Sequence, residues 1–183
     1  MTDEGLREDI VSRKVVFEGR LFQVELRRVR LANGLETTRE VVKHGGAVAL
    51  VPVLADDSVV LVRQFRSAAG EALLEIPAGT LEPGETPEAC AARELAEETG
   101  YRAGRLERLF SSFLAPGYSS EMLHTFLAAG LEPTAAHADS DEVLRLETIA
   151  LSEAPMLIRA GVIKDAKTIC GLLLAASRLG EGW

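Results

Sequence analysis

The sequence predicts an α/β protein in which a mixed sheet is sandwiched between helices, with a small antiparallel β subdomain at the N-terminal end. Strand patterns separated by turn residues occupy the first part of the chain, and apolar strands with helical patterns occupy the rest. The 183 residues are 47% apolar, which is enough for one substantial core. We therefore expect a β-hairpin subdomain over residues 1–45 and one main domain over residues 46–183.

Antiparallel strands are expected in the subdomain. The predicted strands are residues 15–17, 22–26 and 37–42. Asn33 and Gly34 lie before the third strand, and an Asn-Gly pair favours a hairpin turn because both residues tolerate positive φ. A sheet of two or three strands is too small to enclose a core of its own.

Strands and C-terminal helices are expected in the main domain. The predicted strands are residues 47–54, 59–63, 123–128 and 143–149, with a polar loop over 133–142. A short helix follows Ser152, and a final helix begins near Asp165. Its inward face is expected to contain Ile169, Leu172, Leu173 and Ala176.

Another helix of the main domain can be recognised from both of its ends. Thr86 is a good N-cap residue, and Pro87 is favoured at the first helical position. Gly100 stands where a helix ends in the left-handed conformation. Residues three and four apart are neighbours on a helix, so three carboxylates share one face. These are Glu94, Glu97 and Glu98.

The acidic face suits a divalent cation. Like charges on adjacent turns repel one another, and a bound cation would remove that repulsion. Carboxylate oxygens are suitable ligands for Mg²⁺ and Mn²⁺, which also bind substrate phosphates. The alternative is a solvated acidic face, which is the usual explanation of an isolated pair such as Glu97 and Glu98.

Charge and composition exclude several classes of protein. The net charge is −8 and the 20 Lys and Arg residues are scattered, which argues against a general nucleic-acid-binding protein. Cys90 and Cys170 are expected to be buried thiols in a reducing compartment. The N-terminal residues lack a secretory pattern, and no segment approaches the ~18 apolar residues of a membrane span. We expect a soluble cytoplasmic protein with no nucleic-acid or membrane partner.

Residues 79–101 resemble the Nudix box, the sequence pattern of a large hydrolase family. Only Tyr101 departs from the pattern, since the family usually has an aliphatic residue there. The matching residues are Gly79, Glu85, Arg93, Glu94, Leu95, Glu97, Glu98 and Gly100. The resemblance implies the Nudix-type α/β/α sandwich and a Mg²⁺ cofactor, with Mn²⁺ as the alternative.

The resemblance also implies roles for the acidic residues. Glu94 and Glu98 would be the main metal ligands, together with the backbone carbonyl of Ala78. Glu97 would be a further ligand or would orient the attacking water. Arg93 would pair with Glu85 or Glu97 and hold the acidic cluster in shape.

Two alternatives are considered for the general base, a carboxylate on a downstream loop and a carboxylate of the acidic helix. In relatives that cleave nucleoside diphosphate sugars, a carboxylate on a downstream loop is a frequent candidate for the base. Here that loop contains Asp139, Asp141 and Glu142, of which Glu142 has the longest reach. Glu97 is the competing base.

Segments outside the box resemble the ADP-ribose pyrophosphatase subgroup. Residues 63–66 and 74–79 look like the run that precedes the box in this subgroup, and Pro116 stands at the offset typical of it. By this resemblance Arg66 would contact a phosphate, and Glu121 would bind the distal ribose. The full implied set of substrate-binding residues is Arg20, Arg39, Arg66, Gly117 and Glu121.

The resemblance therefore implies a pyrophosphatase that cleaves ADP-ribose or a related nucleoside diphosphate sugar to a nucleoside monophosphate and a sugar phosphate. It also implies a homodimer with exchanged N-terminal strands. A GDP-mannose hydrolase or a dinucleoside polyphosphate hydrolase is an alternative, the latter because Tyr118 lies close to a characteristic tyrosine of that group. A third possibility is a non-catalytic sensor of nucleotide sugars, but the intact carboxylates of the box argue against it.

Overall fold

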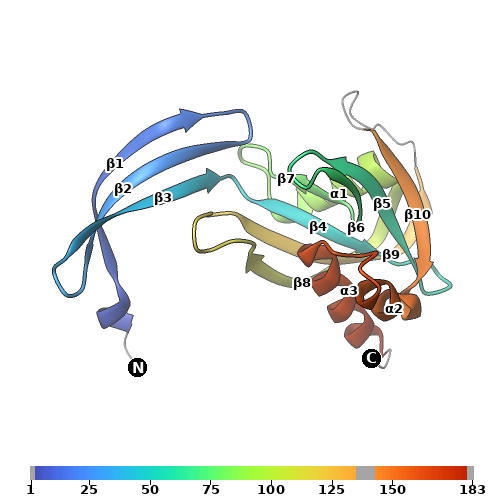
Figure 1. Ribbon diagram of the computed structural model, residues 1–183. Coiled ribbons are helices and arrows are strands. Elements are labelled where there is room, and N and C mark those ends of the chain that lie inside the picture. Colours follow the sequence, from blue (N-terminus) through green and yellow to red (C-terminus); the bar gives the residue numbers. More distant parts are fainter. Residues whose placement is uncertain (1–2, 135–142, 181–183) are drawn as a thin grey trace. The chain divides into compact units, whose positions relative to one another are not determined.

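The computed structural model describes residues 3–134 and 143–180, and the chain divides into two compact units. The first unit consists of Met1–Gly46 and Phe113–Met122. The second consists of Ala47–Ser112 and Leu123–Trp183. The two units are coloured along the sequence in Figure 1.

The first unit contains a three-stranded antiparallel sheet, as the sequence predicted. After a short 3-10 helix, η1 (Asp3–Leu6), the strands are β1 (Glu8–Glu18), β2 (Phe22–Leu31) and β3 (Glu36–His44), in the order β1-β2-β3. The turn between β2 and β3 contains Gly34 at φ 86°, and the N–H of Leu35 donates to Oδ1 of Asn33 at 3.0 Å. The strands are longer than predicted because residues of mixed polarity continue the pairing, back to Glu8 in β1 and on to Leu31 in β2.

The segment Phe113–Met122 is joined to β3 by backbone hydrogen bonds. The N–H of Val42 donates to the carbonyl of Tyr118 at 2.7 Å, and the N–H of Ser120 donates to the carbonyl of Val42 at 2.9 Å. This segment was predicted to belong to a domain over residues 46–183, whereas the structure groups it with the first unit. The functional division at residue 45 stays a prediction.

The second unit contains two sheets. The mixed sheet consists of β4 (Ala47–Pro52), β7 (Ala78–Thr80), β8 (Tyr101–Phe113) and β9 (Met122–Pro133), in the order β7-β4-β9-β8. In this sheet β4 is parallel to β9 and antiparallel to β7. The other sheet is antiparallel and consists of β5 (Ser58–Arg66), β6 (Glu71–Glu75) and β10 (Leu144–Ala150), in the order β10-β5-β6.

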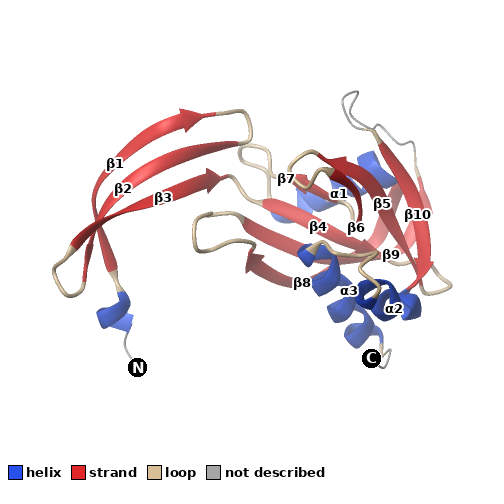
Figure 2. Cartoon of the chain, viewed as in Figure 1, coloured by secondary structure: helices blue, strands red, loops and turns tan. Residues whose placement is uncertain are grey.

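Helices cover the mixed sheet (Figure 2). Helix α1 (Pro87–Thr99) packs on β4 and β7, and α3 (Ala166–Leu179) also packs on β4. Between β10 and α3 lie η2 (Leu151–Glu153) and α2 (Ala154–Arg159). These elements bear out the predicted α/β fold with a mixed sheet and an additional antiparallel sheet.

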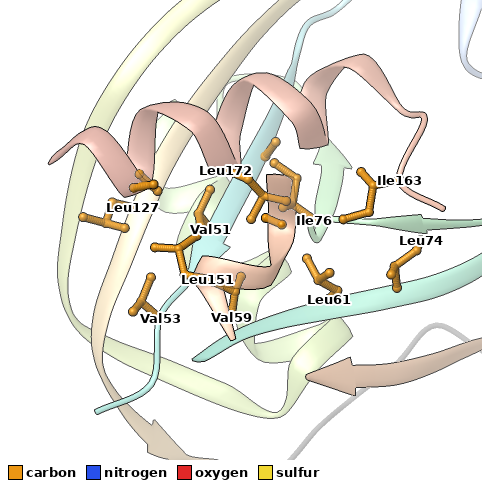
Figure 3. Close-up of a cluster of buried hydrophobic side chains, with 14 of the residues drawn as sticks. Val51, Val53, Val59, Leu61, Leu74, Ile76, Leu127, Leu151, Ile163 and Leu172 are labelled. Atoms are coloured by element: carbon orange, nitrogen blue, oxygen red, sulfur yellow. The ribbon is translucent and has the colours of Figure 1, made fainter. Parts of the chain in front are cut away.

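Two apolar cores lie on the two faces of β4, because alternate residues of a strand point to opposite sides. Ala49 and Val51 belong to the core under α3, while Val48 and Leu50 belong to the core under α1. Figure 3 shows the first core, with Leu172 of α3 among the side chains of the sheets. All six residues of β4 are buried, which explains its uninterrupted apolar sequence.

Several details differ from the sequence expectations. Strands β6, β7 and β8 were not predicted. The residues of β8 are all half-buried or exposed and several are charged, so this strand has no clear apolar pattern. Cys170 and Leu173 were expected to be buried, but both are exposed. The buried face of α3 instead runs through Thr168, Gly171, Leu172, Ala175 and Ala176. In the described residues, no helix is long and apolar enough to cross a membrane.

Candidate active site

Helix α1 has the ends that the sequence predicted. The side chain of Thr86 accepts a hydrogen bond from the N–H of Ala89 at 3.2 Å, and Pro87 occupies the first helical position. Gly100 has φ 69° and ψ 24°, and its N–H donates to the carbonyl of Ala96 at 3.0 Å. Both ends therefore use local interactions that place α1 in a fixed position after the loop that begins at Gly79.

Two of the three predicted acidic residues of α1 are buried and do not belong to a solvated face. Glu94 is 9% exposed and Glu98 is 5% exposed, while Leu95 lies in the core under α1. A buried carboxylate without polar partners is strongly unfavourable. The surrounding structure must therefore supply donors or a cation for these two groups.

Arg93 connects three carboxylates of this region. Its Nε and Nη2 donate to the two oxygens of Glu85 at 3.0 and 2.9 Å. Its Nη1 donates to Glu94 at 2.7 Å and to Glu97 at 2.9 Å. The planar guanidinium is suited to this arrangement because it presents several donors in fixed directions. Arg93 thus sets the positions of these carboxylates relative to one another.

The ion pairs shift the acid–base properties of the cluster. Hydrogen bonds from Arg93 lower the pKa of Glu85 to about 2. The same pairing with Glu85 is the largest cause that raises the pKa of Arg93 above its ordinary value. Burial and, after it, the neighbouring Glu85 raise the pKa of the Cys90 thiol to about 12. Cys90 is therefore a neutral thiol at physiological pH.

The loop before α1 lies against the buried carboxylates. A Cβ atom on Gly79 would lie 1.8 Å from Cδ of Glu94, so only glycine leaves room for this side chain. The N–H of Ala78 donates to Oε2 of Glu98 at 3.0 Å. Two consecutive residues of β7 therefore contact the two buried carboxylates of α1.

A second group of charged residues lies in the same unit, at the end of β6. Nε and Nη2 of Arg66 donate to the two oxygens of Glu75 at 3.0 and 2.9 Å. Nζ of Lys167 donates to the same carboxylate, which is almost completely buried. The hydrogen bonds with Glu75 are the largest cause that raises the pKa of Arg66. The charge of Glu98 on α1 makes a smaller contribution in the same direction, so Arg66 lies close to α1.

The first unit contains other predicted substrate-binding residues. Arg39 and Gly117 line the same recess of about 450 Å³, in which Tyr118 also lies. Arg39 pairs with Glu8, with an Nη2–Oε1 distance of 2.6 Å. Arg20 lines a different recess of about 400 Å³. The structure thus brings Arg39 and Gly117 together and places Arg20 apart from them.

Residues 43–171 match the family model of the NUDIX domain. The chain belongs to the Nudix family. It is 37% identical over 167 residues to the ADP-ribose pyrophosphatase of Bacillus subtilis (strain 168), with 90% of both chains covered. It is also 37% identical over 142 residues to the GDP-mannose pyrophosphatase of Citrobacter koseri, covering 72% of this chain and 73% of that relative.

Solved structures support the same assignment. The fold resembles a crystal structure of an ADP compounds hydrolase with a TM-score of 0.85 and 27% sequence identity, covering 95% of each chain. The family resemblance predicted from the box is therefore confirmed over nearly the whole length. The protein is a Nudix hydrolase.

Nudix hydrolases generally depend on divalent metal ions, and the donors around α1 have suitable chemistry. Within residues 3–134 and 143–180, no three His, Cys, Asp or Glu side chains are gathered in a geometry that could hold a metal ion. The predicted ligands are instead held by Arg93 and by the N–H of Ala78. Each carboxylate has about four acceptor sites, so such hydrogen bonds are compatible with a cation. The ligand set of this Nudix hydrolase stays a prediction.

The other predicted site residues lie in different parts of the chain. Glu142, Asp139 and Asp141 lie outside the described residues. Glu121 lies in the first unit, where its N–H donates to Oγ of Ser119 at 3.2 Å. Sequence reasoning missed Glu75 and Lys167, whose importance emerges only from their contacts with Arg66. A lone glutamate and lysine 92 positions apart carry no sequence signal that would connect them.

Proposed function

We propose that this Nudix hydrolase is a Mg²⁺-dependent pyrophosphatase that cleaves ADP-ribose or a related nucleoside diphosphate sugar. The products would be a nucleoside monophosphate and a sugar phosphate. The observation that carries the proposal is the burial of Glu94 and Glu98 against Ala78 and Gly79. Two buried carboxylates beside a backbone loop provide hard oxygen donors where a phosphorylated substrate needs its charge neutralised.

The proposed metal ligands are Glu94, Glu97, Glu98 and the carbonyl of Ala78. When bound, Mg²⁺ or Mn²⁺ would neutralise charge that develops on the diphosphate. Arg93 would hold the carboxylates in fixed relative positions through its ion pairs with Glu94 and Glu97. These are positioning tasks, which is what hydrolysis of a diphosphate mainly requires from a protein.

Arg66 is the proposed phosphate contact in the second unit. Two of its five N–H groups are donated to Glu75, and its side chain is 39% exposed. A partly exposed guanidinium that is fixed on one side can offer its remaining donors to an anion. The proposed general base is Glu97 or one of the downstream carboxylates Asp139, Asp141 and Glu142.

The first unit is proposed to bind the nucleotide part of the substrate. Arg39 and Gly117 share a recess of a size suited to a small ligand. Arg20 and Glu121 complete the proposed set. This assignment is supported by the mixture of charged and apolar groups in the recess and by the ADP-ribose pyrophosphatase relatives.

We further propose a homodimer in which the N-terminal sheet is exchanged between subunits. All eleven residues of β1 are exposed, including apolar side chains that are 41–52% exposed. An exposed apolar strand on a three-stranded sheet favours coverage by another surface. The apolar side chains are Ile10, Val11, Val15, Val16 and Phe17. Light scattering at micromolar concentration should give twice the monomer mass of 19.7 kDa, and a monomeric mass would contradict this proposal.

The relative from Citrobacter koseri supports a second candidate substrate, GDP-mannose. The decisive experiment is a panel of ADP-ribose, other nucleoside diphosphate sugars, GDP-mannose and dinucleoside polyphosphates, each with Mg²⁺ or Mn²⁺ and with the products identified. We expect the highest kcat/KM with ADP-ribose or a close relative. Binding without turnover of any diphosphate would instead support the sensor reading. The cytoplasmic location stays a prediction from the sequence.

A further inference from the structure

A buried ionic network joins α3 to the end of β6. Glu75, the last residue of β6, is 1% exposed and accepts hydrogen bonds from Arg66 of β5 and Lys167 of α3. Nζ of Lys167 also donates to Oδ2 of Asp165 at 2.9 Å. A single carboxylate is therefore shared by two cations that come from different parts of the second unit.

The direction of the Arg66 side chain depends on this carboxylate. In the pairing of β5 with β6, Glu75 lies opposite Val62, whereas Arg66 lies opposite Glu71. Arg66 is four residues further along β5 than Val62, which corresponds to about 13 Å of strand. The guanidinium must extend back along the sheet to reach Glu75. The backbone register alone does not impose this direction, so Glu75 does.

Lys167 lies beside the contacts that anchor α3, and its Nζ donates to the capping oxygen itself, Oδ2 of Asp165. Asp165 caps the helix by accepting from the N–H of Thr168 at 3.0 Å. The hydroxyl of Thr168 in turn accepts from the N–H of Ile76 at 2.9 Å. These hydrogen bonds anchor the first turn of α3 to the chain just after β6. The ammonium group of Lys167 touches this anchor only at Oδ2 of Asp165, which also accepts from the N–H and the hydroxyl of Thr168.

The charge of Lys167 affects how strongly Glu75 neutralises Arg66. Burial alone would raise the pKa of Glu75, but hydrogen bonding by Arg66 and the charge of Lys167 outweigh it, and the pKa is lowered. Glu75 is therefore ionised and binds two cations at once. Because the side chain of Lys167 is only 11% exposed, water screens its interaction with Glu75 weakly. Without Lys167, the full charge of Glu75 would act on Arg66.

We propose that Lys167 is a positioning residue for substrate binding: by sharing Glu75, it leaves Arg66 fixed in direction and only partly neutralised, so that Arg66 can bind the substrate diphosphate. This inference rests on the proposed function, in which Arg66 contacts a phosphate. An interaction of this kind strengthens the ground state and the transition state alike, so its loss raises KM and leaves kcat nearly unchanged.

The test compares Lys167→Met and Lys167→Arg in steady-state hydrolysis of ADP-ribose. We expect Lys167→Met to raise KM about tenfold with kcat within about threefold of wild type, and Lys167→Arg to restore KM to within about threefold. KM does not depend on the concentration of folded enzyme, so partial unfolding cannot mimic this result. The matched control is Lys164→Met, since Lys164 also pairs with a glutamate of β6, Glu71, but both side chains are about half exposed.

A double-mutant cycle tests whether the effect passes through Arg66. In an Arg66→Met background, Lys167→Met should change KM less than about twofold, because the residue through which it acts is absent. Additive effects of the two substitutions would overturn the proposal, as would a lower thermal stability of Lys167→Met with an unchanged KM. If the wild-type protein turns over neither ADP-ribose nor another nucleoside diphosphate sugar, the proposed function itself fails, and this inference fails with it.

Discussion

The carboxylate of Glu94 occupies the space in which any residue other than glycine at position 79 would place its Cβ atom. The distance from that Cβ position to Cδ of Glu94 would be 1.8 Å, far below van der Waals contact. Glu94 ends in a flexible side chain, so it can move away while the backbone stays in place. Gly79 therefore controls where a buried carboxylate lies more than it controls whether the chain folds.

The first prediction follows from this contact. Gly79→Ala should reduce kcat/KM about 100-fold through displacement of Glu94. The free energy of unfolding should fall by only about 1 kcal/mol, because a flexible side chain can yield to the added methyl group. Kinetics and urea unfolding check the two expectations. Gly5→Ala is the control, since nothing lies within 4 Å of a Cβ atom there; wild-type activity in Gly79→Ala would show that the position of Glu94 is unimportant.

The second prediction concerns the proposed metal ligands. Glu94→Gln and Glu98→Gln should each lower kcat by at least about 100-fold, because the neutral amide is a weaker ligand for Mg²⁺ than the carboxylate and does not balance the charge of the cation. The fold should persist, since glutamine retains the size of the side chain and an oxygen acceptor for the N–H of Ala78. Circular dichroism and metal titration calorimetry complete the measurement. Glu88→Gln on the same helix is the control, because that side chain is 57% exposed and pairs with Arg108.

The third prediction concerns acid stability. The pKa of Glu85 is lowered from 4.5 to about 2 in the folded protein, so the unfolded state binds the proton more readily. The stabilisation by this group is fully present above about pH 4.5 and is lost as the pH falls towards 2. Glu85→Gln should therefore show a smaller loss of unfolding free energy between these pH values than wild type. Equal pH dependence in the two proteins, measured by urea unfolding, would contradict the role of the Arg93 ion pair.

The fourth prediction compares two buried threonines, both with 0% exposure. In the described part of the chain, Oγ1 of Thr125 has no hydrogen-bond partner. Thr125→Val should therefore raise the free energy of unfolding by about 1 kcal/mol. Thr168→Val should lower it by about 1–3 kcal/mol, because the hydroxyl of Thr168 donates to Asp165 and accepts from Ile76. Chemical unfolding of both variants provides the check, and equal effects would refute the difference in hydrogen bonding.

Local sequence was sufficient to predict the elements whose ends are set by nearby residues. Helix α1 begins after Thr86 and ends before Gly100 because capping depends on groups within four residues. The turn at Gly34 was predictable for the same reason, and the buried strand β4 was predictable from its uninterrupted apolar sequence. Strand β8 was not, because its side chains are mostly intermediate or exposed and show no apolar alternation.

The candidate site was only partly predictable. The spacing of Glu94, Glu97 and Glu98 placed them on one helix face, but it could not show that Glu94 and Glu98 are buried and Glu97 is less so. Burial depends on Gly79, whose contact with Glu94 requires the loop and the helix to pack together. The link between Glu75 and Lys167 depends on residues that are distant in the chain.

The amino-acid sequence by itself determined the family, the α/β fold class, the N-terminal hairpin and the acidic helix with its two caps, because these depend on residue types at short fixed spacings. Only the tertiary structure decided that Phe113–Met122 joins β3, that Arg66 turns back to Glu75, and that Lys167 shares this carboxylate. The physical reason is the range of the interactions. Hydrogen bonds and ion pairs between elements depend on strand register and on helix packing, which no local pattern records.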